Sequence, residues 1–196
     1  METVDSILEF WFGTAADDAI TAKRQAKLWW QKDPQADALI LQRFEGYVQQ
    51  AASGELDAWT ATPSGLLALI LLTDQFPRNM YRDTPQAFAF DTLARGWCKQ
   101  GIGAAADFSL RPLQRVFFYL PLEHSESLPD QQQSVALFAK LAADSGGPTL
   151  AGYVDYARRH HDVIARFGRF PHRNRILGRA STAEELAFLT EKGSSF

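Results

Sequence analysis

The chain has 196 residues, with 20 Lys and Arg against 23 Asp and Glu, which gives a formal net charge of −3. Hydrophobic residues make up 46% of the sequence and charged residues 22%, which excludes a disordered, collagen-like or disulfide-stapled chain. A chain of this length can bury enough surface to fold without a metal or a disulfide. We therefore expect a single domain over residues 1–196.

Three further features narrow the class of protein. The single cysteine, Cys98, excludes an internal disulfide and a cysteine-based zinc site, and we expect it to have a packing role. The acidic N-terminus lacks the basic start of a secretory signal. The longest strongly apolar run, Leu66 to Leu72, has seven residues, against about 20 for a membrane helix. These features predict a cytoplasmic protein that does not interact with membranes.

Apolar residues recur with a helical period through almost the whole chain, and helix-capping residues mark the ends of the periods. In the first half the pattern predicts helices from Val4 to Phe12, from after Asp17 to the break at Pro34, from Pro34 to about Ala52, from near Ser64 onwards, and from Thr84-Pro85 to Gly101. The helix that begins near Ser64 is apolar on every side, which predicts a position in the middle of the domain.

The second half predicts helices around Pro112–Leu120, Pro129–Asp144 and Thr149–Phe167, and a last helix opened by the capping box Ser181-Thr-Ala-Glu184. The helix that starts at Pro112 is expected to kink or restart at Pro121, because proline lacks an amide hydrogen. No segment has the alternation or hairpin turns of β-strands. Short connections therefore predict an all-α fold of about eight to nine helices packed as antiparallel pairs.

Two helix exits resemble each other. Asp74-Gln-Phe-Pro-Arg-Asn79 and Gly168-Arg-Phe-Pro-His-Arg-Asn174 both follow a long helix and both place Phe-Pro before Arg and Asn. The similarity is either chance or the trace of a duplicated helical hairpin, as in stacked repeats. The full tetratricopeptide signature is not matched, so the sequence indicates only a repeat-like helical arrangement.

The first of these exits carries an unfavourable charge. Asp74 stands at the C-terminal end of the apolar helix, where the helix dipole disfavours a negative group. A structural clamp with Arg78 or Arg82 would compensate it. Alternatively, Arg78, Asn79 and Arg82 face a cleft and bind an anion, since the planar guanidinium matches carboxylate and phosphate.

Acid–base candidates lie in two other segments. Glu123, His124 and Glu126 directly follow Pro121, where they can either perform acid–base catalysis or begin a new helical turn. His160 falls on the apolar face of the helix Thr149–Phe167, so its imidazole needs a partner. It is either a core histidine bonded to a carbonyl or carboxylate, or a functional group.

The charges are unevenly distributed along the second half of the chain. Seven arginines and one aspartate give residues 158–179 a charge of +6, and four acids against one lysine give residues 123–144 a charge of −3. Internal pairing is one interpretation, and an RNA- or phosphate-binding surface is the other. No RNA-binding motif or aromatic stacking platform accompanies the arginines, so we expect no nucleic-acid partner.

Several sites with sequence signatures are not predicted. The pairs Glu123 with Glu126 and His160 with His161 each supply only half of a metal site. Glycine-rich nucleotide loops and the Gly-x-Ser-x-Gly hydrolase elbow are also missing from the sequence. We expect neither a metal nor a cofactor.

Four stretches, read together, resemble domain-of-unknown-function family 924. They are Ile7-Leu-Glu-Phe-Trp-Phe-Gly13, Asp74-Gln-Phe-Pro-Arg-Asn79, Pro121-Leu-Glu-His-Ser-Glu126 and Arg166-Phe-Gly-Arg-Phe-Pro-His-Arg-Asn174. Their order and spread extend the resemblance over nearly the whole chain. It implies an all-helical fold similar to right-handed tetratricopeptide-like superhelices. It implies no established reaction, so no catalytic residue is transferred and enzyme activity is left open.

Three functional hypotheses remain open. In the first, the two Phe-Pro exits and the Pro121 segment converge on a pocket for a small anionic ligand. Its acid–base candidates are Glu123, His124 and His160, and its ligand-binding candidates are Asp74, Arg78, Asn79, Arg82, Glu126, Arg169, His172, Arg173 and Asn174. In the second, the helices form a tetratricopeptide-like scaffold that binds a peptide or protein without catalysis. In the third, the charged groups only lock helix ends together.

Oligomeric state is also open. Trp29 and Trp30 adjoin each other, and an unburied tryptophan pair would indicate a homodimer interface.

Overall fold

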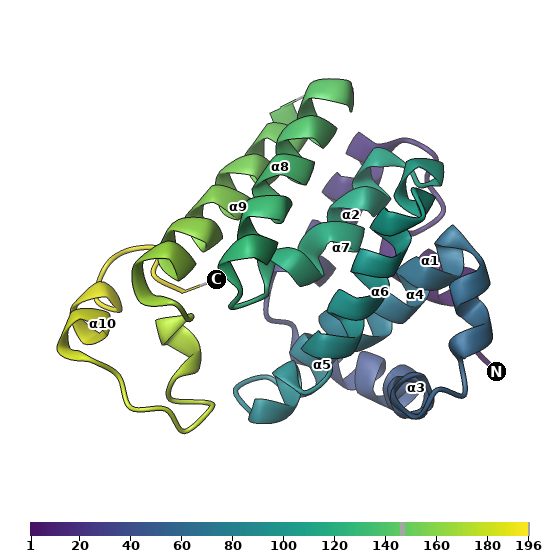
Figure 1. The fold of residues 1–196 in the computed structure, drawn as a ribbon. Helices are drawn as coiled ribbons and strands as arrows, with labels where there is room; N and C mark the ends of the chain where they lie inside the picture. The colour runs from purple at the N-terminus through teal and green to yellow at the C-terminus, as the bar shows by residue number, and fades with distance from the viewer. Residues whose placement is uncertain (146–147, 196) are drawn as a thin grey trace.

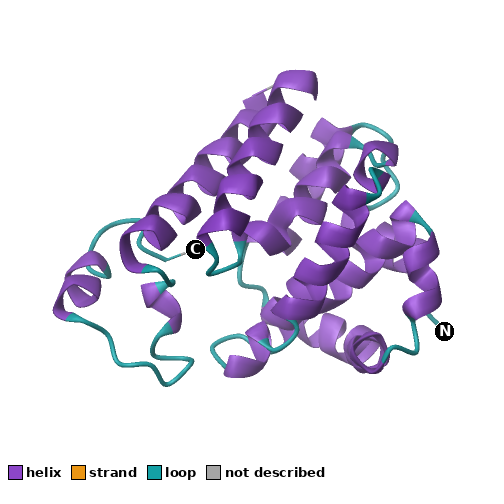
Figure 2. Cartoon of the chain, viewed as in Figure 1, coloured by secondary structure: helices purple, strands orange, loops and turns teal. Residues whose placement is uncertain are grey.

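The computed structural model describes residues 1–145 and 148–195, and within them every regular element is helical (Figures 1 and 2). The all-α prediction is therefore confirmed. The α-helices are α1 (Val4–Phe12), α2 (Asp18–Trp30), α3 (Pro34–Ser53), α4 (Pro63–Ile70), α5 (Phe76–Met80), α6 (Asp91–Gly103), α7 (Pro112–Glu123), α8 (Leu128–Ser145), α9 (Pro148–Phe167) and α10 (Ala183–Phe188).

Shorter helical turns connect these elements. Turns of 3-10 helix cover Asp57–Ala61, Pro85–Phe88, Ala106–Ser109 and Pro171–Arg173, and a π-helical turn covers Leu71–Gln75. None of the described helices combines the length and the apolar character that crossing a membrane requires.

Local sequence signals set most helix boundaries. The Asp17 side chain accepts a hydrogen bond at the start of α2, and Asp33 does the same at the start of α3, directly before Pro34 at the first helical position. At the other end, Gly54 takes a left-handed conformation (φ 84°) that a side chain would strain, and it terminates α3.

The apolar helix α4 occupies the centre of the main core. Residues 66–72 are at most 3% exposed, and α4 packs against α1, α6 and α7. Cys98 on α6 is fully buried in the same core, in agreement with its expected packing role. The prediction that the all-apolar segment lies in the middle of the domain is correct.

The arrangement of the other helices is only partly that of successive antiparallel pairs. Helices α8 and α9 lie side by side, and α7 packs against α8, whereas α3 packs against α5 and α4 against α6 (Figure 1). A right-handed tetratricopeptide-like superhelix therefore stays a prediction.

Three predicted boundaries are wrong in detail. Thr84-Pro85 opens a 3-10 turn, and α6 begins only at Asp91. Helix α7 does not restart at Pro121 but continues to Glu123, because a buried segment is held by packing that outweighs one missing backbone hydrogen bond, and the alternative expectation of a kink stays a prediction. The capping box of α10 is formed by Thr182 and Glu185, one residue later than expected, since two overlapping sets of residues match the same motif.

The tryptophan pair is not exposed as a unit. Trp29 is 8% exposed and donates a hydrogen bond to the Trp11 carbonyl, whereas the neighbouring Trp30 is 51% exposed and stacks on Phe117. The condition set for a homodimer interface is thus only half met, and the homodimer stays a prediction.

A second, smaller core lies at the end of α9. Phe170 packs there with Val163 and Ile164, and Phe188 of α10 covers them. Figure 1 shows α10 on the side of the molecule away from α1. The chain after α9 thereby folds back and brings the turn Pro171–Arg173 toward the rest of the molecule.

Candidate functional site

A buried aspartate is the centre of the candidate site. The π-helical turn after α4 is closed by the amide of Phe76, which donates to the carbonyl of Leu71 five residues earlier. Pro77 contributes to this widening because it cannot donate to the carbonyl of Thr73. Asp74 lies in this turn and is 0% exposed. The wider turn thus carries a carboxylate inside the molecule.

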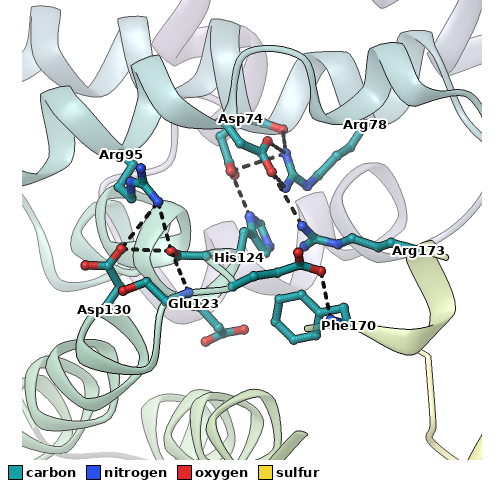
Figure 3. Close-up of polar contacts among 12 residues, drawn as sticks. Asp74, Arg78, Arg95, Glu123, His124, Asp130, Phe170 and Arg173 are labelled. Atoms are coloured by element: carbon teal, nitrogen blue, oxygen red, sulfur yellow. Dashed lines mark hydrogen bonds and ion pairs between the residues drawn. The ribbon is translucent and has the colours of Figure 1, made fainter. Parts of the chain in front are cut away.

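Three side chains surround the Asp74 carboxylate. Gln75 Nε2 donates a hydrogen bond to Oδ2 at 2.6 Å, Nδ1 of His124 lies 2.7 Å from Oδ1, and an Arg78 nitrogen lies 3.3 Å from the same oxygen (Figure 3). Burial alone would raise the pKa of Asp74, but the Arg78 charge and the contact with His124 outweigh it and hold the pKa below its ordinary value. Asp74 is therefore ionised at neutral pH.

Arg78 connects Asp74 to a second carboxylate. Its guanidinium donates to the Asp74 carbonyl at 2.7 Å and to both carboxylate oxygens of Asp91, at 2.8 and 3.0 Å. Asp91 is the first residue of α6. The clamp expected for Asp74 is thus formed by Arg78, and it ties α5 to α6.

His124 has one engaged ring nitrogen. It directly follows α7, and its side chain is 15% exposed. Burial first, and then the Arg78 charge, lower the pKa of His124 despite the opposing effect of Asp74. Because Asp74 is ionised, the tautomer consistent with the contact has the hydrogen on Nδ1, and Nε2 is then an acceptor. This pairing suits a general base, since the carboxylate orients the ring.

Arg173 completes the group that we name the Asp74 cluster, defined as Asp74, Arg78, Asp91, His124 and Arg173. Arg173 is 6% exposed and lies between two aromatic rings. Its Nη1 atom is 3.6 Å from an Asp91 oxygen, and its buried Nε has no hydrogen-bond acceptor in the described part of the chain. Burial and the neighbouring charge of Arg78 lower the pKa of Arg173 to about 10.

Glu123 and His160 form a neighbouring pair. Glu123 Oε1 lies 3.3 Å from Nδ1 of His160, which also lies 2.9 Å from the Tyr156 carbonyl. Burial and the charge of Asp74 raise the pKa of Glu123 to about 8. Burial chiefly lowers the pKa of His160 to about 3. Both groups are therefore uncharged at pH 7, and His160 matches the interpretation of a core histidine bonded to a carbonyl.

Two of the predicted ligand-binding residues point elsewhere. Asn79 donates to Asp37 of α3 at 2.9 Å, and Arg82 donates to the same carboxylate at 2.6 and 2.9 Å. Arg82 thus already has a carboxylate that pairs with two of its guanidinium nitrogens. These contacts tie α5 to α3.

Two further candidates, Glu126 and Asn174, hold the C-terminal segment. Glu126 accepts two hydrogen bonds from Arg179, at 2.6 and 2.9 Å, and one from the amide of Phe170. Asn174 accepts from Arg179 as well. We call the contact of Glu126 with Arg179 and Phe170 the C-terminal latch.

Arg169 and His172 lie in the same segment. Arg169 donates to both carboxylate oxygens of Glu185, at 2.6 and 2.8 Å. The His172 ring lies 5.5 Å from the Phe170 ring, and burial followed by the charge of Arg173 lowers its pKa to about 4. His172 is therefore neutral at pH 7.

The sequence interpretation missed three residues of this region. Asp91 has no motif, and only its position at the start of a helix marks it. Arg179 was noted within the basic stretch but not assigned to a site. Gln131 of α8, fully buried, donates to the carbonyls of Glu123 and Ser125 at 2.6 and 2.7 Å and so holds the end of α7.

Two open surface depressions lie outside the Asp74 cluster. The first, of about 430 Å³, is lined by Arg166, Phe167, Arg169, Thr182, Glu184 and Glu185. Its arginines already pair with its glutamates, so its charges need no ligand. The second is lined by residues around Lys32. Over residues 1–145 and 148–195, no three His, Cys, Asp or Glu side chains converge as metal ligands.

Comparisons with known proteins agree with this fold. A family model described as "bacterial protein of unknown function (DUF924)" matches residues 7–193. A solved protein of unknown function from Agrobacterium tumefaciens is 38% identical, with a TM-score of 0.82 over 96% of this chain and 97% of the other. The chain matches no curated protein.

Proposed function

Since this chain belongs to the DUF924 family, whose description names no reaction, we propose a function from the cluster itself: the protein binds a small anion at Arg173, beside His124. We propose binding of the anion and no reaction. His124, which is suited to act as a general base, lies in the same site.

The proposal rests on the Arg173 guanidinium, which is buried but incompletely hydrogen-bonded. It is 6% exposed, its Nε has no acceptor, and its nearest carboxylate is 3.6 Å away. Burying a charged donor without an acceptor is costly. A carboxylate or phosphate would supply the missing acceptors in the paired geometry that a guanidinium prefers.

The surroundings of Arg173 support access by a small ion. The side chains of His124 and Asp91 are 15% and 25% exposed, so the cluster has a partly open edge. The rings of Phe88 and Phe170 lie 4.7 and 4.5 Å from the guanidinium carbon and hold it in place. A fixed guanidinium loses little side-chain freedom when it binds an anion.

The purely structural hypothesis accounts for other arginines better than for Arg173. Arg82, Arg169 and Arg179 each donate to a carboxylate at 2.6 Å. Such pairs need no ligand to satisfy their charge. The peptide-binding scaffold remains an alternative prediction, and a peptide that ends in a carboxylate would use the same guanidinium.

Titration calorimetry at constant ionic strength, with acetate and inorganic phosphate as separate probes, tests the proposal. We expect at least one of the two anions to bind, and Arg173→Met to weaken it about tenfold or more, because a charged hydrogen bond is lost. Arg82→Met is the matched control, since Arg82 is satisfied by Asp37, and it should bind within about twofold of the wild type.

Two results would overturn the anion site. One is the failure of both probes, and of the related small carboxylate glycolate, to bind the wild type. The other is unchanged binding by a folded Arg173→Met protein, with folding verified by circular dichroism.

A further inference from the structure

The hydrogen position on His124 limits what its free nitrogen can bind. Asp74 is buried and ionised, so its oxygen accepts and Nδ1 of His124, at 2.7 Å, donates. A neutral imidazole carries one hydrogen, so Nε2 must be an acceptor. The lowered pKa of His124, caused by burial and then by Arg78, keeps the ring neutral at pH 7.

The protein groups around His124 leave Nε2 without a hydrogen-bond donor. The charged or titratable side chains that act on His124 come from several packed elements: Asp74 of the π-helical turn, Arg78 of α5, His160 of α9, and His172 and Arg173 of the Pro171–Arg173 turn. In the part of the chain that the structure describes, no hydrogen bond reaches Nε2. A ligand beside His124 therefore gains from carrying a donor of its own.

His124 and Arg173 belong to one continuous set of contacts. His124 meets Asp74 at 2.7 Å, Arg78 joins Asp74 to Asp91, and Asp91 lies 3.6 Å from Arg173. Figure 3 shows the His124 and Arg173 side chains next to each other, and the Arg173 charge contributes to lowering the pKa of His124. The acceptor and the cation therefore belong to the same cluster and interact electrostatically.

We propose that the ligand of this site is a small hydroxycarboxylate, whose carboxylate binds Arg173 and whose hydroxyl donates a hydrogen bond to Nε2 of His124. The inference rests on the proposed anion site and adds the chemical class of its ligand. A simple carboxylate satisfies Arg173 but brings only acceptors toward Nε2. The added hydroxyl supplies the donor.

The charge of the cluster favours a carboxylate over a phosphate. Two guanidiniums, Arg78 and Arg173, face two carboxylates, Asp74 and Asp91. A monoanion adds one negative charge to this balanced set, whereas the phosphate dianion adds two and is repelled more strongly by the two carboxylates.

Glycolate and acetate, which differ by one hydroxyl on the same small carboxylate, test the inference. We expect wild-type protein at pH 7.5 to bind glycolate about tenfold more tightly than acetate, with inorganic phosphate weaker than glycolate. His124→Phe removes the acceptor and should bring the ratio of the two affinities close to one. Glu9→Gln, at an exposed position on α1, is the control.

A second measurement, by NMR, uses only wild-type protein and so does not require any variant to fold. In wild-type protein, the ¹⁵N resonance of His124 Nε2 should shift with glycolate and stay in place with acetate. Equal binding of glycolate and acetate, or tighter binding of phosphate, would overturn the hydroxycarboxylate while leaving the anion site intact. No binding by any of the three would overturn the anion site itself.

Discussion

At the scale of single residues, Glu123 gives the sharpest test of how burial changes the pKa of a side chain. It is 4% exposed at the C-terminal end of α7, and burial with the nearby Asp74 raises its pKa to about 8. Between the ordinary value of 4.5 and about 8, the folded protein retains a proton that the unfolded chain releases. Stability should therefore fall as the pH rises through this range and level off above it.

Glu123→Gln imitates the protonated side chain and should remove this pH dependence. We expect the variant to exceed the wild type in unfolding free energy by on the order of 2 kcal/mol at pH 9, with a much smaller difference at pH 5. Urea unfolding at both pH values measures the effect, and Glu9→Gln is the exposed control. The same difference at pH 5 and pH 9 would show that Glu123 is not protonated in the folded protein.

Which charged side chains pair with each other was the feature of the site hardest to predict from the sequence. The sequence identified Asp74 as a charge that needed a cation, and Arg78 supplies it. It could not assign Arg82 to Asp37, because that pairing depends on how α5 packs against α3, 45 residues away in the chain. Local spacing predicts charged pairs within a helix, and tertiary packing chooses partners between helices.

At the scale of secondary structure elements, α8 positions the catalytic candidates at the end of α7. Gln131 Nε2 donates to the carbonyls of Glu123 and Ser125, which have no partner within the helix. We expect Gln131→Ala to lower the unfolding free energy by about 2–3 kcal/mol, since it leaves buried carbonyls unsatisfied. It should also weaken anion binding, because His124 lies in the segment that Gln131 holds.

A neighbour on the same helix provides the control for this prediction. Gln132 is exposed on α8, and Gln132→Ala should change the unfolding free energy by less than about 0.5 kcal/mol. Urea unfolding compares the two variants. Equal stabilities would show that the end of α7 is held by packing alone.

Helix existence followed from the sequence more reliably than helix ends. The apolar period located the helices, but the restart expected at Pro121 does not occur, because α7 is buried there and continues to Glu123. The capping rule failed by one residue at Ser181, because its hydroxyl accepts a hydrogen bond from Asn174 instead. In both cases a contact from outside the element overrode the local rule.

At the scale of the whole molecule, the candidate site depends on two cores that meet. The main core places Asp74 and His124, whereas Arg173 follows the smaller core around Phe170. One of the three sequence hypotheses placed these segments at a common pocket. Contacts link Asp74 to Arg173 through Arg78 and Asp91, whereas Arg169 bonds Glu185 instead, and the pocket stays a prediction. The separation into two cores was not predicted, because the helical period of α9 runs on without a break.

The C-terminal latch joins the segment after α9 to the main body. Arg179 donates two hydrogen bonds to Glu126, which also accepts from the Phe170 amide. We expect Arg179→Met to speed amide hydrogen exchange in α10 about tenfold or more and to leave α4 unchanged, since the hydrogen bonds that Arg179 donates to Glu126, Asn174 and Phe170 all lie outside α4. Anion binding should weaken in parallel, because the same segment positions Arg173.

Hydrogen exchange followed by mass spectrometry measures both helices in one experiment. Arg158→Met is the matched control, since Arg158 belongs to the same half of the chain and pairs with Asp155 on the exposed surface of α9, with side chains 61% and 76% exposed. Such a pair contributes little, so α10 should exchange within about twofold of the wild type. If Arg179→Met speeds exchange equally in α10 and α4, the two cores unfold as one cooperative unit, and the latch does not control the position of Arg173 separately.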